Sequence, residues 1–169
     1  MNNATNKTVI VLLIFFTMNT FSQNTSQTVQ AINDMKFMLE EEKVARDVYE
    51  YLDEIWDLRV FNNIKQSEQR HMDMMQTLLD DNEIDYKVSS KRGFFYNKDL
   101  QKMYDDLTER GSKSRQDAFL VGKLIEETDI ADLEKAITNT NDDHIKHVYS
   151  NLLRASQNHL RAFNRQLSK

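Results

Sequence analysis

The stretch MKFMLEEEKVARDVYEYLDEIW, residues 35–56, decides the fold class of this protein. Its apolar residues recur at steps of three and four, the spacing that places side chains along one stripe of an α-helix. The members of the stripe are Met35, Met38, Glu42, Ala45, Tyr49, Leu52 and Trp56. The spacing therefore predicts a helix over about 33–56 whose buried face carries a single carboxylate, that of Glu42.

Three later segments repeat the pattern, and each again has polar residues in the middle of an apolar stripe. The spacing predicts helices over about 61–79, 114–137 and 143–167. Ser114, with Asp117 three residues later, resembles a capping box at the start of the second of these helices. The polar members of the three stripes are, in order, Glu68 and His71, Glu126 and Asp129, and His159.

The pattern breaks between residues 80 and 114. Gly93 and the aromatic run 94–96 predict a loop that folds back. A short helix follows over about 98–110, which Gly111 is placed to end in a left-handed conformation. Because this connection is much longer than the other two, the sequence predicts an all-α four-helix bundle with a crossover link that carries a short extra helix.

Composition supports the all-α prediction and excludes several kinds of site. The 169 residues include no proline and three glycines, which favours long helices. Without cysteine there can be no disulfide, iron–sulfur cluster, zinc ribbon or thiol nucleophile, so any metal must be bound by carboxylates and imidazoles. The net charge of −5 gives no basic surface for phosphate backbones, and nucleic acid is not an expected partner.

Residues 1–22 have the layout of a secretory signal peptide. Lys7 precedes an apolar run at 9–16, and small polar residues follow. The run is much shorter than the roughly 20 residues that span a bilayer as a helix. We therefore predict a protein exported to the periplasm or beyond, with a flexible leader at 23–30 and one domain at 31–169. An uncleaved membrane anchor and a buried first helix are the alternative interpretations.

The polar residues near the centres of the four long helices are the candidate metal ligands: Glu42, Glu68, His71, Glu126, Asp129 and His159. In an antiparallel bundle they reach one level, where unpaired carboxylates would be costly to bury. Two divalent cations would neutralise four carboxylates, and each imidazole would bind one ion. Alternatively, these residues fix the helix register without metal, and Glu42 pairs with a nearby arginine.

Four segments of the chain resemble a known group of proteins. EEEKVARDVY at 40–49 and SEQRHMD at 67–73 are similar to ligand motifs of rubrerythrin-type proteins. Together with IEETDIADLE at 125–134 and NHLRAF at 158–163, they resemble an uncharacterised ferritin-like domain family of bacteria and archaea. The resemblance implies a ferritin-like four-helix bundle with a di-iron carboxylate centre.

One position departs from that pattern. The resemblance implies a glutamate three residues before the histidine of the fourth helix, where this chain has Ser156. Asp129 is the candidate that replaces this carboxylate, and Glu127 is the alternative. A rotation of the helix by one step would exchange the roles of Glu126 and Glu127. Occupancy of the second metal position depends on this replacement.

These observations predict a metal-dependent function. We expect two iron ions, or iron with manganese, that react with O₂ or peroxide in ferroxidase or peroxidase-type chemistry. Tyr49 is a core residue or a redox partner of the metals. An external electron donor would be required, because the chain has no cysteine-bearing segment to deliver electrons. A storage module without catalysis and a metal-free interaction protein are the alternatives, and the sequence leaves open whether the bundle forms a homodimer.

Overall fold

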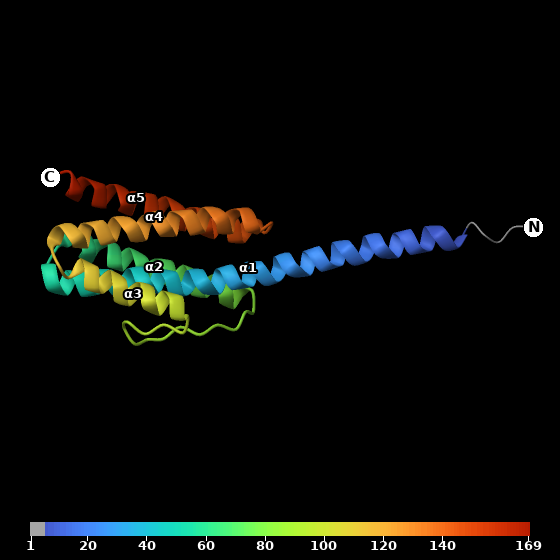
Figure 1. Ribbon diagram of the computed structural model, residues 1–169, viewed down its shortest axis with the longest axis horizontal. Helices are drawn as coiled ribbons and strands as arrows, with labels where there is room; N and C mark the ends of the chain where they lie inside the picture. The colour runs from blue at the N-terminus through green and yellow to red at the C-terminus, as the bar shows by residue number, and fades with distance from the viewer. Residues whose placement is uncertain (1–5) are drawn as a thin grey trace, which may run out of the picture.

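The computed structural model describes the backbone of residues 6–169 and the side chains from residue 29 onward. In this part of the chain there are five α-helices and no strand: α1 (Asn6–Trp56), α2 (Arg59–Asp81), α3 (Lys98–Gly111), α4 (Arg115–Asn139) and α5 (Asp143–Leu167). Figure 1 shows α1, α2, α4 and α5 side by side, with α3 along the outside. Helix α1 packs against α2 and α4, and α5 packs against the same two helices. The predicted all-α helical bundle is confirmed.

The start of α1 differs from the prediction. The sequence places the first helical residue near residue 33, whereas the backbone is helical from Asn6 and includes the stretch predicted to be a flexible leader, 23–30. Residues 1–5, and the side chains up to residue 28, lie outside the described residues, so the signal peptide at 1–22 and its cleavage stay predictions. In the described part, no helix is long and apolar enough to cross a membrane.

Local sequence explains where the helices begin. At the start of α4, the Ser114 hydroxyl accepts the backbone N–H of Asp117 at 3.0 Å, which confirms the predicted capping interaction. At the start of α5, the Asp142 carboxylate accepts the N–H groups of His144 and Ile145. These caps satisfy amide groups that have no partner within the helix. They fix where α4 and α5 begin.

Gly111 does not end α3 in the predicted way. It is the last residue of the helix, and Ser112 caps it with a right-handed backbone. A Cβ atom on Gly111 would lie 2.7 Å from Leu52, so the glycine instead allows α3 to approach α1 closely. Gly122 has the same role between α4 and α5, where a Cβ atom would lie 2.4 Å from the Phe163 ring.

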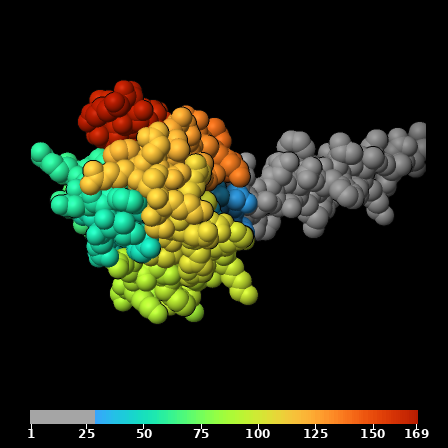
Figure 2. All heavy atoms as spheres, turned by 60° about the vertical axis from the view of Figure 1, so that its left-hand side comes forward, coloured from blue at the N-terminus to red at the C-terminus, as the bar shows by residue number. Residues whose placement is uncertain are grey.

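The long connection between α2 and α3 is held against α1 by three buried charged residues. Glu40 accepts the backbone N–H groups of residues 96 and 97 at 2.8 and 3.0 Å. Asp47 accepts the N–H of Gly93 at 2.9 Å and forms an ion pair with Lys43. Helix α1 is therefore covered on more than its apolar stripe. In Figure 2 the blue part of α1 is visible between α3 and α4.

The apolar core is divided into two clusters along the bundle. One contains residues 44–52 of α1 with Phe61 and Phe163, and the other contains residues 35–39 of α1 with Met75 and Leu152. On each long helix, the polar residues of the stripe fall between the two clusters. The fold therefore places a polar layer between two apolar layers, at one depth in the bundle.

Candidate metal centre

Four helices contribute side chains to the polar layer. Glu42 comes from α1, Glu68 and His71 from α2, Glu126 from α4, and His159 from α5. The three glutamates are each at most 2% exposed. Because water is excluded there, these carboxylates must be compensated by protein groups, by protons or by a bound cation.

The side chains form two groups of three that share Glu68. The first is Glu42, Glu68 and His71, and the second is Glu68, Glu126 and His159; in each, the potential ligand atoms all lie within 4.8 Å of one another. His71 Nδ1 lies 2.7 Å from Glu68 Oε2, while His159 Nδ1 lies 2.9 Å from Glu68 Oε1. The two oxygens of one carboxylate thus face two different imidazoles, which is the arrangement of a bridging ligand.

Several of these atoms are close together without being hydrogen bonded. Glu42 Oε1, Glu68 Oε1 and His159 Nδ1 are buried and have no hydrogen-bond partner. Leaving a buried polar atom unpaired costs on the order of 1–3 kcal/mol, and more when it is charged. A set of carboxylates and imidazoles that point into a shared space fits a divalent first-row cation. The residues present therefore fit a metal centre.

In the absence of metal, the buried acids and imidazoles share protons unequally. Burial raises the pKa of Glu42 and of Glu126 to about 7 in each case. Burial also acts to raise the pKa of Glu68, but the close contacts of its carboxylate with the imidazoles of His159 and His71 outweigh it and lower this pKa to about 2. Glu68 is therefore the acid that stays charged, and it lies between the two imidazoles.

The same neighbours raise the pKa values of the two imidazoles, which favours their charged form. Burial acts to lower the pKa of His71, but the charge of Glu42 and its hydrogen bond outweigh it, and the pKa rises to about 11. For His159, burial is likewise outweighed by Glu126 and Glu68, and the pKa rises to about 9. A metal ion that binds here must displace protons from these groups.

This proton balance predicts how the stability of the metal-free protein depends on pH. Glu42 and Glu126 have folded-state pKa values above the ordinary 4.5, and His71 and His159 have values above the ordinary 6.5. Over about pH 5 to 8 the folded state thus binds more protons than the unfolded state, so its free energy of unfolding falls as the pH rises. Thermal unfolding of chelator-treated protein across this range measures the effect; a midpoint that rises with pH would contradict it.

Asp129 lies in the polar layer but in neither group of three. It is 6% exposed, and its Oδ2 accepts the hydroxyl hydrogen of Ser156. Its other oxygen, Oδ1, is buried and unpaired. Ser156 stands where the glutamate of the fourth helix was expected. It thus binds Asp129, the residue predicted to replace that glutamate. Glu127 is exposed and lies 3.6 Å from Lys123, so it faces away from the layer.

Two further residues belong to the surroundings of the centre. The Tyr49 hydroxyl donates to Glu126 Oε1 at 2.6 Å, which fixes the orientation of that carboxylate. Glu41 is buried with both carboxylate oxygens unpaired, and it lies outside the predicted apolar stripe of α1. The signal was available in the triple acid at 40–42, because successive helical residues differ by about 100° and three adjacent acids cannot all face solvent on a buried helix. Arg46 pairs with Asp47 and Gln69, not with Glu42.

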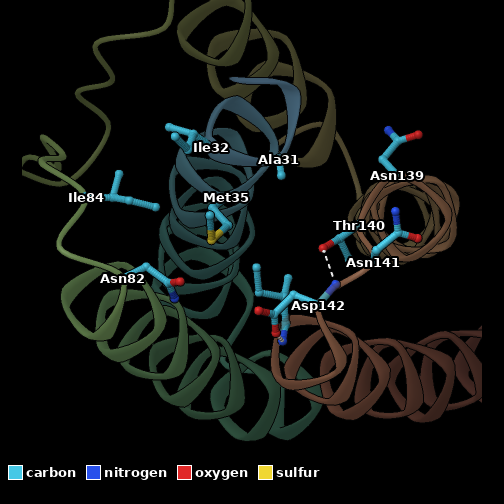
Figure 3. Close-up of a pocket in the computed structure, with 10 residues that line it drawn as sticks. Ala31, Ile32, Met35, Asn82, Ile84, Asn139, Thr140, Asn141 and Asp142 are labelled. Atoms are coloured by element: carbon cyan, nitrogen blue, oxygen red, sulfur yellow. Dashed lines mark hydrogen bonds between the residues drawn. The ribbon is translucent and has the colours of Figure 1, made fainter. Parts of the chain in front are cut away.

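A hollow at one end of the bundle is separate from this centre. It has a volume of about 390 Å³ and lies where the start of the packed part of α1 meets the α4–α5 turn. Figure 3 shows Met35 and Asn82 at its wall, with a hydrogen bond between Thr140 and the backbone of Asp142. None of the candidate ligands lines it.

Comparison with known proteins places the chain in a family. Residues 31–169 match the family described as Uncharacterized protein domain (DUF2202). The chain belongs to the DUF2202 family. Uncharacterized protein MJ0754 of Methanocaldococcus jannaschii is 48% identical to this DUF2202 protein over 132 residues, which cover 78% of this chain and 71% of the relative.

A solved structure supports the helical architecture. The crystal structure of hypothetical protein MJ0754 from Methanococcus jannaschii matches with a TM-score of 0.80 at 46% sequence identity, covering 81% of this chain and 79% of that one. Neither name states an activity. The comparisons therefore establish the family, and the polar layer is the feature of the molecule that bears on its function.

Proposed function

We propose that this DUF2202 protein is a ferritin-like bundle that binds two divalent metal ions, iron or iron with manganese, in its polar layer. The observation that carries the proposal is the pair of three-residue groups that share Glu68, with buried ligand atoms left unpaired. Glu42 and His71 would hold one ion, Glu126 and His159 the other, and Glu68 would bridge them. Asp129 would add a carboxylate if its contact with Ser156 were released.

The proposed chemistry is ferroxidase activity or reduction of O₂ or peroxide. A carboxylate-rich iron pair supplies redox equivalents for such a reaction when it is bound. The protein's own contribution is to hold the ligands in a layer from which water is excluded, and to orient Glu126 through the Tyr49 hydroxyl. The electron donor would be a separate reductant. We also propose that the protein acts after export, following cleavage near residue 22.

The test is to load the metal-free protein with Fe²⁺ under anaerobic conditions and to mix it with O₂ or with H₂O₂ in a stopped-flow instrument. We expect about two iron ions per chain and oxidation faster than that of Fe²⁺ in buffer. The matched controls are two neighbouring acids: Glu126→Gln should reduce binding and oxidation, whereas Glu127→Gln, at an exposed position, should leave both unchanged. Less than one metal ion per chain in the wild type would contradict the proposal and favour a metal-free interaction protein.

A storage module without catalysis is the second candidate. The hydrogen bond between Ser156 and Asp129 favours it, because it leaves the second position with fewer free carboxylates than the fold pattern supplies. This candidate predicts metal binding and a raised melting temperature, since a ligand bound only to the folded state stabilises that state. It also predicts no oxidation above the rate in buffer, so the same stopped-flow experiment separates the two candidates.

A further inference from the structure

A second set of acids lies beside the polar layer, between α1 and α4. Glu41 is 5% exposed, and neither of its carboxylate oxygens has a hydrogen-bond partner. Its side chain lines a small cavity together with Asp129, whose Oδ1 is also buried and unpaired. The volume of this cavity is about 10 Å³, which is roughly the space of one water molecule or one small ion.

Asp132 is a further acid of α4, close to Asp129 in the sequence. It lies three residues after Asp129 on α4, so both side chains are on the same face of that helix. Burial raises the pKa of Glu41 well above its ordinary value, and the charge of Asp132 is the next cause. Asp132 is partly exposed and lines an open hollow of about 210 Å³ with Asp34 and Lys135.

These acids range from a partly exposed position on α4 to buried positions beside the centre. Asp132 lies at the rim, Glu41 and Asp129 line the small cavity, and Glu42 follows Glu41 in the chain with its own unpaired oxygen facing the layer. Figure 2 shows that α1 reaches the surface beside α4 on this face of the molecule. On the other side of α1, which faces α2, Glu42 contacts His71.

We propose that Glu41, Asp129 and Asp132 form a further divalent-cation site, through which metal ions pass from the surface into the centre. The proposal rests on the metal-binding function proposed above. A buried carboxylate with both oxygens unpaired is costly to maintain, and a passing cation compensates it. Acids that line a narrow, poorly solvated space also raise the local concentration of cations once they release their protons, and this speeds cation association by roughly 10- to 1,000-fold.

The test measures the rate of metal uptake separately from the amount bound. Metal-free full-length protein is mixed with Co²⁺ alone at low ionic strength, and its visible absorption is followed in a stopped-flow instrument. We expect Glu41→Gln to slow Co²⁺ uptake by about tenfold or more, within the range of such electrostatic effects, with the final amount of bound Co²⁺ unchanged. Asp132→Asn, at the partly exposed rim, should slow uptake several-fold. This second variant leaves the buried Glu41 in place.

Glu134→Gln is the matched control, because it removes the same charge from an exposed position of α4. It should change the uptake rate less than twofold. Wild-type uptake rates in both Glu41→Gln and Asp132→Asn, with full Co²⁺ binding, would overturn the loading site and leave the centre in place. Failure of the wild-type protein to bind Co²⁺ would overturn the centre and the loading site together.

Discussion

Glu68→Gln should abolish metal binding at both positions, because Glu68 is the one residue that belongs to both groups of three. Loss of a group that only orients a ligand costs about 10- to 100-fold in metal affinity, and loss of a bridging ligand should exceed this. Glu42→Gln and Glu126→Gln each remove a ligand from a single group. Each of these two variants should therefore retain one metal ion per chain where Glu68→Gln retains none, as measured by metal analysis after equilibrium dialysis.

The same three variants should differ in the stability of the metal-free protein. Glu68 stays charged between His71 and His159, so its replacement leaves two buried imidazolium groups with one fewer partner and lowers the melting temperature. Glu126 is forced toward its neutral form by burial, so Glu126→Gln should be neutral or stabilising below about pH 7. Equal retention of metal by all three variants would rule out the shared role of Glu68.

Asp47→Ala should be the most destabilising substitution away from the centre. Asp47 and Lys43 are both completely buried, with 2.5 Å between their charged atoms. Removing the carboxylate leaves the Lys43 ammonium with two backbone carbonyls and the face of the Phe95 ring. Breaking a buried ion pair from one side costs about 3–5 kcal/mol, and we expect a loss of that size in the free energy of unfolding measured with denaturant.

Two comparisons make this expectation specific. Lys43→Met should cost less, because Asp47 would still be paired with Arg46 and with the backbone N–H of Gly93. Asp106→Ala breaks an ion pair with Lys102 of the same i,i+4 spacing at an exposed site, and it should have no measurable effect. Similar losses of unfolding free energy in Asp47→Ala and Asp106→Ala would show that burial does not determine how much the ion pair contributes to stability. Asp47→Ala should also expose the loop at 91–97 to limited proteolysis, because Asp47 holds Gly93.

Much of the centre could be predicted because its signal is local in the sequence. A polar residue that interrupts an apolar stripe of period three to four is recognisable within one helix, and Glu42, Glu68, His71, Glu126 and His159 were all recognised in this way. Their convergence follows from helix length and antiparallel packing alone. Their role as metal ligands remains a proposal.

Other features depend on contacts between distant segments and have no such local signal. Glu40, Lys43 and Asp47 would face solvent if the stripe of α1 were its only buried face, but the connection at 91–97 covers them. Gly111 was expected to supply a left-handed cap, whereas its role is set by Leu52 on another helix. The contact of Asp129 with Ser156 depends on how α4 and α5 are rotated relative to each other.

The sequence by itself determined the helical class, the four long helices and the depth at which their polar residues meet, because helical periodicity makes the buried face of each segment visible without its partner. Only the tertiary structure decided which carboxylate lies between both imidazoles, which acid is held by a serine, and that Glu41 is buried beside the layer. The reason is that these outcomes depend on distances of a few ångströms between different helices. Spacing within a helix fixes the direction of a side chain but not the group that it meets.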